Sequence, residues 1–595
     1  MDNNKNFIAA IILSVAILVG FHYFYEAPQQ ERYQKQVAAE KQAELVKPAE
    51  VAPVTTPLHD RAEVIGSDKR ISIVTPQLKG SVNLKGGRID DLTLIQYRES
   101  VDPSSPQVIL LSPTGSAAPH TTYFAEFSWL STDPAIKLPT EETLWSSDGG
   151  VLAPDHPLTL TWHNEQGLAF ERTIAIDDQY MFTVTDQVRN GGSTPATLFP
   201  FGLIRRQGVP PNLSTYMQEG PLGVMDSTLN DYKYKDLIDG KKAIDSTGGW
   251  LGFTDKYWLT ALVPPQNEKL NIEFSYTNAP NLDPSQGLFQ ADFRGAPVSV
   301  PPGASVEHVT RLFAGAKPLV LLDRYADQYS IPHFDRAIDF GRFYWLAEPF
   351  LYLLDYLARY LGSFALAILA FTVILKILTL PLSIKSYRSM AKMKALQPEL
   401  KRLQERYADD KPRQGAEVLE LYKREKVNPV SGCFPMLIQL PIFFALYKVL
   451  YVGFEMRQAP FYGWIKDMSI PDPTSILTLF GLFPSAGIQH VIDYLNTLPA
   501  MFTLFGALTG ILVTLSHIGA WPIFMGASMF LQQRLSPQPP DKTQARVFMF
   551  MPLIFAFTMA QMPAGLVIYW TWSNLLSIGQ QWFVMSHTGG LKKAS

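Results

Sequence analysis

Two patterns of hydrophobic and polar positions divide the chain. Between residues 58 and 325, short runs alternate apolar and polar residues, and turn-forming stretches such as Pro301-Pro302-Gly303 separate them. A period of two is typical of strands in an antiparallel sheet. Four of the clearest runs are Ile71–Val74, Leu158–Trp162, Phe182–Thr185 and Leu270–Phe274. This pattern predicts a large antiparallel β domain, a sandwich or a barrel, over residues 58–340.

The second pattern consists of long apolar runs. Phe7–Tyr25 has 19 residues without Asp, Glu, Lys or Arg, and a helix of that length nearly crosses a hydrocarbon core of about 30 Å. Residues 1–25 are therefore predicted to be an uncleaved transmembrane anchor. A signal peptide is the alternative, but the run ends in aromatic residues rather than an A-x-A-like site. Five further spans are predicted in residues 362–588, at Phe364–Leu382, Phe434–Phe454, 512–531, Val547–Met562 and Gly565–Met585.

Two segments next to these runs have a different composition. Residues 26–57 contain few large apolar side chains, which predicts a flexible linker; a short polar helix over 31–46 is the alternative. Residues 341–361 mix large apolar residues with Glu348, Asp355 and Arg359. This mixture predicts an amphipathic helix at a membrane surface, with a buried globular helix as the alternative.

Residues 383–428 are predicted to form a helical hairpin. Apolar side chains recur there near the 3.5-residue period of packed helices, at Met390, Met393, Leu396, Leu400, Leu403 and Tyr407. Residues 409–412 (Asp-Asp-Lys-Pro) break the pattern, and Ala416–Lys426 is expected to return as a second helix. Any solvated helical hairpin would show the same pattern.

Charge predicts the orientation of these segments. Residues 383–428 contain 12 Lys and Arg against 7 Asp and Glu, and residues 534–546 are also basic. Both should be cytoplasmic by the positive-inside rule. Residues 499–531 must then cross the membrane an odd number of times, and 33 residues are too few for three spans. We therefore expect one crossing, with residues 499–511 lying along or dipping into the outer interface. Both termini, including the short basic tail 589–595, are expected inside, and residues 26–345 outside in the periplasm.

Composition narrows the chemistry. The net charge of −3 over 595 residues selects no nucleic-acid partner, and the single cysteine, Cys433, cannot form an intrachain disulfide. Walker, HExxH and paired-cysteine motifs do not occur in the sequence. We therefore predict no cofactor and no metal, and we do not predict an enzyme. A sugar-enzyme site in the β domain would rest on fold analogy alone.

Several ordered motifs resemble the YidC/Oxa family of membrane protein insertases. In the apolar half they are residues 389–398 (SMAKMKALQP), 425–429 (EKVNP), 432–441 (GCFPMLIQLP), 444–447 (FALY), 563–570 (PAGLVIYW) and Ser573-Asn574. Residues 248–258 (GGWLGFTDKYW) resemble the periplasmic domain of the Gram-negative branch. The resemblance implies an insertase core of five transmembrane helices, a preceding anchor and a periplasmic super-sandwich similar to galactose mutarotases.

The resemblance also implies a function. The chain would insert and fold nascent inner-membrane proteins in the bacterial inner membrane, as insertase and chaperone, through a hydrophilic groove open to lipid and cytoplasm. It would act alone or with the Sec translocon, and a ribosome is a further partner. Two departures from the family stand out. Lys376 occupies a position where the family often has arginine. The loop at about 484–518 is longer and more apolar than the corresponding loop of other family members. The short tail weakens the expectation of ribosome docking.

Six residues are candidates for this groove: Lys376, Thr372, Gln439, Gln532, Tyr569 and Trp570. Lys376 is the sharpest, because a cation within a span attracts acidic residues and water. Lys376 could instead snorkel to the interface, the polar residues could only bond neighbouring helices, and the aromatic residues could be ordinary packing.

Two other functions compete with the insertase. A secondary transporter would also use a charged groove, but transporters typically show internal repeats and midplane carboxylates. No internal repeat is evident, and the predicted spans contain no Asp or Glu. A membrane-anchored sugar-binding or isomerase module would leave the hairpin and the five spans unexplained.

Overall fold

The structure is a computed structural model of the full chain. It describes residues 58–587 except 211–212, 214–216, 279–282, 409, 426, 428–433, 483–514, 517 and 536–541. The predicted anchor, linker, tail and interfacial stretch 499–511 lie outside the described residues. The described chain divides into two compact units, one ending at Asp339 and the other beginning at Phe340.

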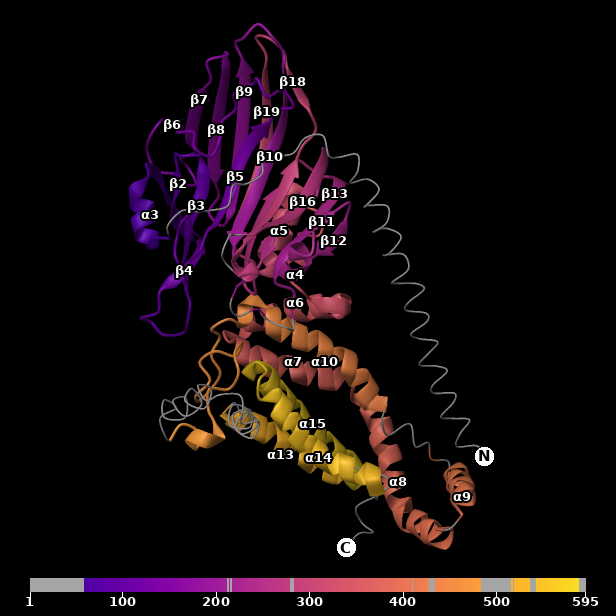
Figure 1. Cartoon of the computed structure of the whole chain (residues 1–595). Coiled ribbons are helices and arrows are strands. Elements are labelled where there is room, and N and C mark those ends of the chain that lie inside the picture. Colours follow the sequence, from indigo (N-terminus) through magenta and orange to yellow (C-terminus); the bar gives the residue numbers. More distant parts are fainter. Residues whose placement is uncertain are drawn as a thin grey trace, which may run out of the picture. The chain divides into compact units, whose positions relative to one another are not determined.

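The first unit is an antiparallel sandwich of two sheets (Figure 1). Along the hydrogen-bonded path of the ten-stranded sheet, the order is β1 (Arg70–Val74), β2 (Leu78–Asn83), β3 (Arg88–Arg98), β5 (Tyr123–Leu130), β10 (Ala196–Gln207), β17 (Leu288–Arg294), β16 (Lys269–Thr277) and β13 (Lys242–Thr247). β4 (Gln107–Leu111) pairs with β3, and β18 (Val298–Val300) pairs with β10.

The second sheet has nine strands. Their order is β12 (Thr228–Asp231), β11 (Gly220–Met225), β14 (Trp250–Thr254), β15 (Trp258–Val263), β19 (Ser305–Ala316), β9 (Met181–Asn190), β8 (Leu168–Ile176), β7 (Leu158–His163) and β6 (Ser146–Ser147). The unit also contains α3 (Arg61–Ser67), α4 (Tyr234–Ile238), α5 (Leu319–Tyr329) and the short 3₁₀ helices Pro284–Gln286 and Phe334–Ala337. The predicted antiparallel sandwich is confirmed.

The period-two pattern lies in these strands as expected. The four sequence runs coincide with parts of β1, β7, β9 and β16. In β8 every second residue is buried, from Leu168 to Ile176. A turn at Gly248-Gly249 separates β13 from β14, and both glycines have positive φ. A Cβ atom on Gly249 would lie 2.0 Å from the carbonyl oxygen of Val224, so no larger residue fits without a backbone shift.

One arginine joins the two sheets. Arg172 on β8 is 1% exposed. Its Nε donates to Asp186 of the neighbouring strand at 2.7 Å. Its guanidinium also donates to two carbonyl oxygens of the other sheet. These are the oxygen of Phe127 on β5, at 2.7 Å, and that of Gly87 just before β3, at 3.3 Å. The guanidinium carbon lies 5.0 Å from the ring centroid of Trp145. These contacts satisfy a buried charge that would otherwise be costly.

The second unit is helical. Its helices are α6 (Tyr344–Leu361), α7 (Phe364–Leu378), α8 (Leu380–Arg406), α9 (Lys411–Arg424), α10 (Phe434–Val452), α13 (Ala520–Leu535), α14 (Lys542–Met559) and α15 (Ala564–His587). Single 3₁₀ turns occur at Gly341–Phe343, Phe454–Met456 and Ile476–Thr478. The predicted amphipathic helix over 341–361 appears as α6, which buries Ala347, Phe350, Leu351 and Leu354.

The predicted span Phe364–Leu382 is bent in the structure. α7 ends at Leu378, and α8 starts at Leu380 with a 66° change of direction. Pro381 in the first turn of α8 explains the break, because proline cannot donate a helical hydrogen bond and clashes with the preceding turn. This bent pair passes a test of length and apolarity for a membrane span, whereas no single helix does among the described residues. Gln439–Val452 and Ala545–Met559 are shorter apolar helices.

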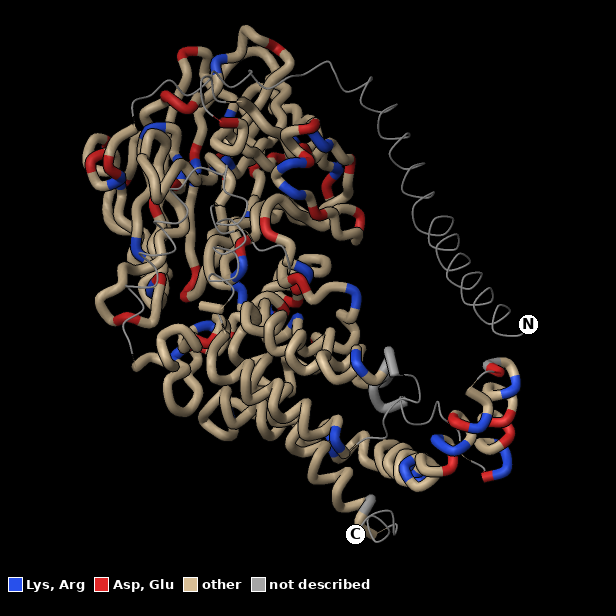
Figure 2. The backbone as a smooth tube through the Cα atoms, turned by 60° about the horizontal axis from the view of Figure 1, so that its bottom comes forward, with Lys and Arg blue, Asp and Glu red and all other residues tan. Residues whose placement is uncertain are grey.

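The predicted hairpin forms from α8 and α9. α9 begins at Lys411, five residues before the predicted Ala416, because the Asp410 side chain accepts the N–H of Arg413 and Pro412 is tolerated in a first turn. Lys, Arg, Asp and Glu positions are frequent along this hairpin, while most of the other helices of the unit carry few (Figure 2). At the start of the predicted seam, Met390 packs with Tyr387 and with Val584 of α15. That part of the seam is therefore occupied by a neighbouring helix.

The described residues between α10 and α13 hold the ends of two later helices. Asp472 accepts hydrogen bonds from the indole of Trp464, from Thr474 and from the backbone N–H of Trp521. The last bond, at 2.9 Å, caps the first turn of α13 from a distant segment. Carbonyl oxygens of Met468 and Ile470 accept the N–H groups at the start of α15. α13 therefore begins at Ala520, and residues 512–514 and 517 of the predicted span 512–531 lie outside the described residues.

Candidate functional site

Lys376 lies in a polar contact between α7 and α15. Its Nζ donates to the Ser577 hydroxyl at 2.8 Å, and the Ser577 hydroxyl donates to the carbonyl oxygen of Ser573 at 2.9 Å. The amide of Gln580 donates to the Lys376 carbonyl oxygen at 3.4 Å. Within the described part of the chain, no ion pair to an acidic side chain is found for Lys376. The lysine is thus held by neutral groups between otherwise apolar helices.

A polar stripe on α15 provides these partners. Tyr569, Ser573, Ser577 and Gln580 follow one another at steps of four, four and three residues, which places them on one face of a helix. Tyr569, Ser573 and Ser577 are each 5% exposed or less. Buried hydroxyl groups in an apolar helix need partners, and the stripe finds them on α7 and α10.

Gln439 contacts the same stripe from α10. Its Nε2 donates to the Tyr569 hydroxyl at 2.9 Å. The predicted pair Gln439 and Tyr569 is therefore brought together, and both lie on the helices that flank the lysine contact. Lys376 on α7 and Gln439 on α10 reach α15 at positions two helical turns apart, Ser577 and Tyr569.

Trp570 belongs to an aromatic cluster. Its ring centroid lies 4.5 Å from that of Phe443 on α10 and 5.3 Å from that of Phe555 on α14. These distances are typical of aromatic packing contacts. Trp570 therefore packs in an apolar cluster of α10, α14 and α15, next to the polar stripe.

Two predicted residues lie apart from this contact. Thr372 is 1% exposed, and its hydroxyl donates to the Ile368 carbonyl oxygen of its own helix at 2.7 Å. Gln532 is half-buried on α13, next to Gln533, whose amide donates to the Phe548 carbonyl oxygen on α14 at 2.8 Å. The hydroxyl of Thr372 is thus engaged within α7, whereas sequence reasoning placed it toward the groove.

Sequence reasoning missed the hydroxyl and amide partners on α15. Ser577 and Gln580 were not among the candidates, and neither was the buried pair of Asn574 and Ser528, whose side chains bond at 3.0 Å between α15 and α13. The available signal was the recurrence of polar residues at helical spacing within an apolar run. That spacing marks a face of the helix, but it does not say which neighbour the face meets.

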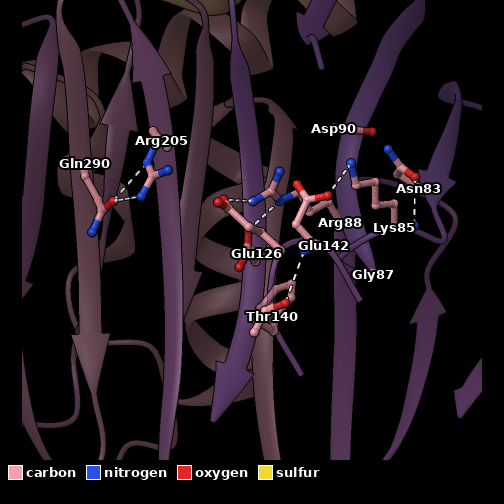
Figure 3. A network of polar contacts seen from close by, with 12 residues as sticks. Asn83, Lys85, Gly87, Arg88, Asp90, Glu126, Thr140, Glu142, Arg205 and Gln290 are labelled. Carbon is pink, nitrogen blue, oxygen red and sulfur yellow. Dashed lines mark hydrogen bonds and ion pairs between the residues drawn. The ribbon is translucent and has the colours of Figure 1, made fainter. Parts of the chain in front are cut away.

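The β unit carries a second polar cluster, on one face of the ten-stranded sheet (Figure 3). Arg88 on β3 bonds Glu126 on β5 at 2.5 Å, and Arg205 on β10 bonds the Gln290 oxygen on β17 at 2.6 Å. Gln290 in turn donates to Asp292 at 2.7 Å. Burial raises the pKa of Asp292 to about 7, while the bond from Gln290 and the charge of Arg205 oppose the shift. Side chains of the cluster thus satisfy one another.

Within the described residues, no group of three or more His, Cys, Asp or Glu has a metal-binding arrangement. The antiparallel sandwich and the apolar helices around Lys376 define a multidomain membrane protein with a helical core and a large β domain. Residues 70–353 match the model of the YidC periplasmic domain, and residues 356–590 match that of the 60Kd inner membrane protein family. The chain belongs to the YidC family of membrane protein insertases.

Full-length relatives agree with this assignment. A membrane protein insertase YidC of Bradyrhizobium diazoefficiens is 45% identical and covers 99% of this chain and 97% of its own length. One from Rickettsia bellii is 43% identical, over 98% of this chain and 99% of its own. A crystal structure of an active YidC insertase matches 86% of this chain and 92% of its own, at 17% identity and a TM-score of 0.35. The resemblance inferred from the motifs is confirmed.

Proposed function

We propose that the protein inserts integral membrane proteins into the bacterial inner membrane and assists their folding. The observation that carries this proposal is Lys376, a cation held among apolar helices by a serine hydroxyl. A polar segment that enters hydrocarbon loses its hydrogen bonds to water, at a cost of several kcal/mol for each unsatisfied group. A hydrated, positively charged groove lowers that barrier without covalent chemistry.

The groove in this proposal is lined by Lys376, Gln439, Tyr569 and Trp570. Lys376 and Gln439 make polar contacts with α15, Gln439 through the Tyr569 hydroxyl, and Trp570 adds an aromatic border. The groove opens to lipid and cytoplasm and is closed toward the periplasm. Acidic residues in an incoming outer segment approach the ammonium before they cross, because opposite charges attract strongly in a low-dielectric environment.

The finer assignments belong to the same proposal. Clients are nascent inner-membrane proteins, delivered alone or together with the Sec translocon, and a ribosome is a further partner at the basic hairpin. Both termini are cytoplasmic, and residues 26–345 are periplasmic. The excess of Lys and Arg in residues 383–428 supports this orientation.

Depletion of the protein in its own cells tests the function. Small inner-membrane proteins should then stay uninserted, as measured by protease accessibility of their periplasmic tails. A chain lacking residues 390–426, rejoined by a short linker, should fail to restore insertion, because the hairpin receives the client first. Normal insertion after depletion would refute the proposal and return a secondary transporter to consideration. Full insertion by the deletion variant would remove the hairpin from the mechanism.

A further inference from the structure

We infer that Ser577, supported by Gln580, is a positioning residue for the Lys376 ammonium, and that it sets the preference for clients with acidic segments. The inference rests on the proposed function. It starts from where the lysine sits: Lys376 is two residues from the end of α7 at Leu378. A flexible four-carbon stem so close to a helix end can turn its charge toward the interface. Something must hold the ammonium beside α15.

Ser577 supplies the hold on the ammonium. The serine is 5% exposed, and its hydroxyl hydrogen is engaged by the Ser573 carbonyl oxygen at 2.9 Å. Because the hydroxyl hydrogen points along α15, the oxygen can accept from the lysine, which donates to it at 2.8 Å, and Tyr387 of α8 also hydrogen-bonds the Ser577 side chain. The bond is therefore directional, and its geometry is set within α15 before the lysine arrives.

Gln580 holds the same residue at its backbone. The carbonyl oxygen of Lys376 lies in the last turn of α7, where it also accepts from the hydroxyl of the capping residue Thr379 at 3.5 Å. The Gln580 amide donates to it at 3.4 Å from the next turn of α15. One face of α15 thus contacts both the ammonium and the main chain of residue 376. The two helices, α7 and α15, are neighbours in the structure (Figure 1).

The hold leaves the lysine with unused capacity. An ammonium has three donors, and Ser577 accepts one of them. Among the residues that the structure describes no second acceptor is found, so the other two donors can serve water or a carboxylate of the client at a defined place on α15. If the Ser577 oxygen is removed, the charge stays in the protein but its position spreads along the stem, so an acidic client loses more than a neutral one.

The test compares Ser577→Ala with a matched control in full-length protein at equal cellular level. Thr571→Val is the control, because Thr571 is also a buried hydroxyl of α15 that donates to its own helix, to Val567 at 2.8 Å, away from the lysine contact. The readout is protease accessibility of two client tails that differ only in acidic or neutral residues. Ser577→Ala should slow insertion of the acidic client about fivefold, which is equivalent to about 1 kcal/mol, the net contribution of one typical hydrogen bond.

Two further measurements separate positioning from packing. Ser577→Thr keeps the hydroxyl and should restore acidic-client insertion to near the parental rate. In a Lys376→Leu background, Ser577→Ala should have no additional effect on either client, because there is no ammonium to place.

Equal losses for both clients, or a loss that persists in the Lys376→Leu background, would overturn the inference and leave Ser577 as a packing residue. So would an unchanged rate for the acidic client. Failure of the parent itself to restore insertion of the neutral client would instead refute the proposed function, so the two failures are distinguishable.

Discussion

The two units of the protein bury a cation in opposite ways. In the β sandwich, Arg172 has a carboxylate partner, two carbonyl partners and an aromatic ring beside it, and it is 1% exposed. In the helical unit, Lys376 is bonded by a serine hydroxyl. Arg172 is buried and Lys376 is half-buried, and of the two only Arg172 is matched by an opposite charge among the described residues.

The difference teaches what each charge can do. The guanidinium of Arg172 is 1% exposed, and all three of its nitrogens donate to protein oxygens, those of Asp186, Phe127 and Gly87, so its role is to join two sheets. Lys376 has one hydrogen-bond acceptor among the described residues, and an ammonium placed among apolar helices costs free energy. Such a cost is tolerated at sites that bind something else, which agrees with the role proposed for Lys376.

The largest expected effect is the loss of Arg172, the cation that is paired with a carboxylate. Arg172→Met should lower the free energy of unfolding of the β unit by about 3–5 kcal/mol, because Asp186 is left buried and unpaired. Hydrogen exchange of β8 and β9 amides in the full chain measures the change. Adding Asp186→Leu should recover part of the loss. An equally stable single variant would show that Arg172 does not hold the sheets together.

A buried carboxylate of the same unit gives a smaller effect that depends on pH. Because the pKa of Asp292 is about 7 in the folded state and about 3.9 in an unfolded chain, the folded state binds an extra proton between these values. Stability should therefore fall as pH rises from 4 to 7. Asp292→Asn should remove this fall and stabilise the β unit at pH 8 by about 2 kcal/mol.

Thermal unfolding of the parent and of Asp292→Asn between pH 5 and pH 8 checks the pH effect. The Gln290 amide can still donate to the new side-chain oxygen, so the hydrogen bond is retained as a control within the variant. If the melting temperatures of the two proteins change with pH in the same way, Asp292 is not the group responsible for the loss of stability.

Lys376 should matter for activity rather than for stability. Lys376→Leu should slow insertion of clients with acidic outer segments about tenfold, equivalent to 1.4 kcal/mol, while the helical unit stays at least as stable because a desolvation cost is removed. Lys376→Arg should retain function with a small quantitative change. Protease accessibility of matched acidic and neutral client tails measures both. Equal insertion by the Leu variant would favour snorkelling as the account of this lysine.

Removal of the β unit should have the smallest effect on insertion. Deletion of most of residues 60–320 leaves every helix of the second unit in place, and the proposed groove lies within that unit. Insertion of small clients should continue at a near-parental rate in a stably expressed deletion variant. If such cells cannot grow, the β unit has an essential role beyond the structural one that Arg172 serves within it.

Local patterns in the sequence determined much of the architecture. A period of two identified strands such as β7 and β9, because a strand with one buried face must alternate its side chains. Apolar runs located α10 and α15 within a few residues of their observed ends. Ordered motifs identified the family, and the isolated charge of Lys376 identified the most conspicuous member of the candidate site.

Only the tertiary structure decided how these pieces meet. The pairing of β10 with β5 and β17, the capping of α13 by Asp472 and the choice of Ser577 as partner of Lys376 join residues far apart in the chain. Periodicity shows which face of an element is polar or buried, since that depends on near neighbours. It cannot show which distant face will satisfy a buried hydroxyl or ammonium, because that is settled by the packing of whole helices and sheets against one another.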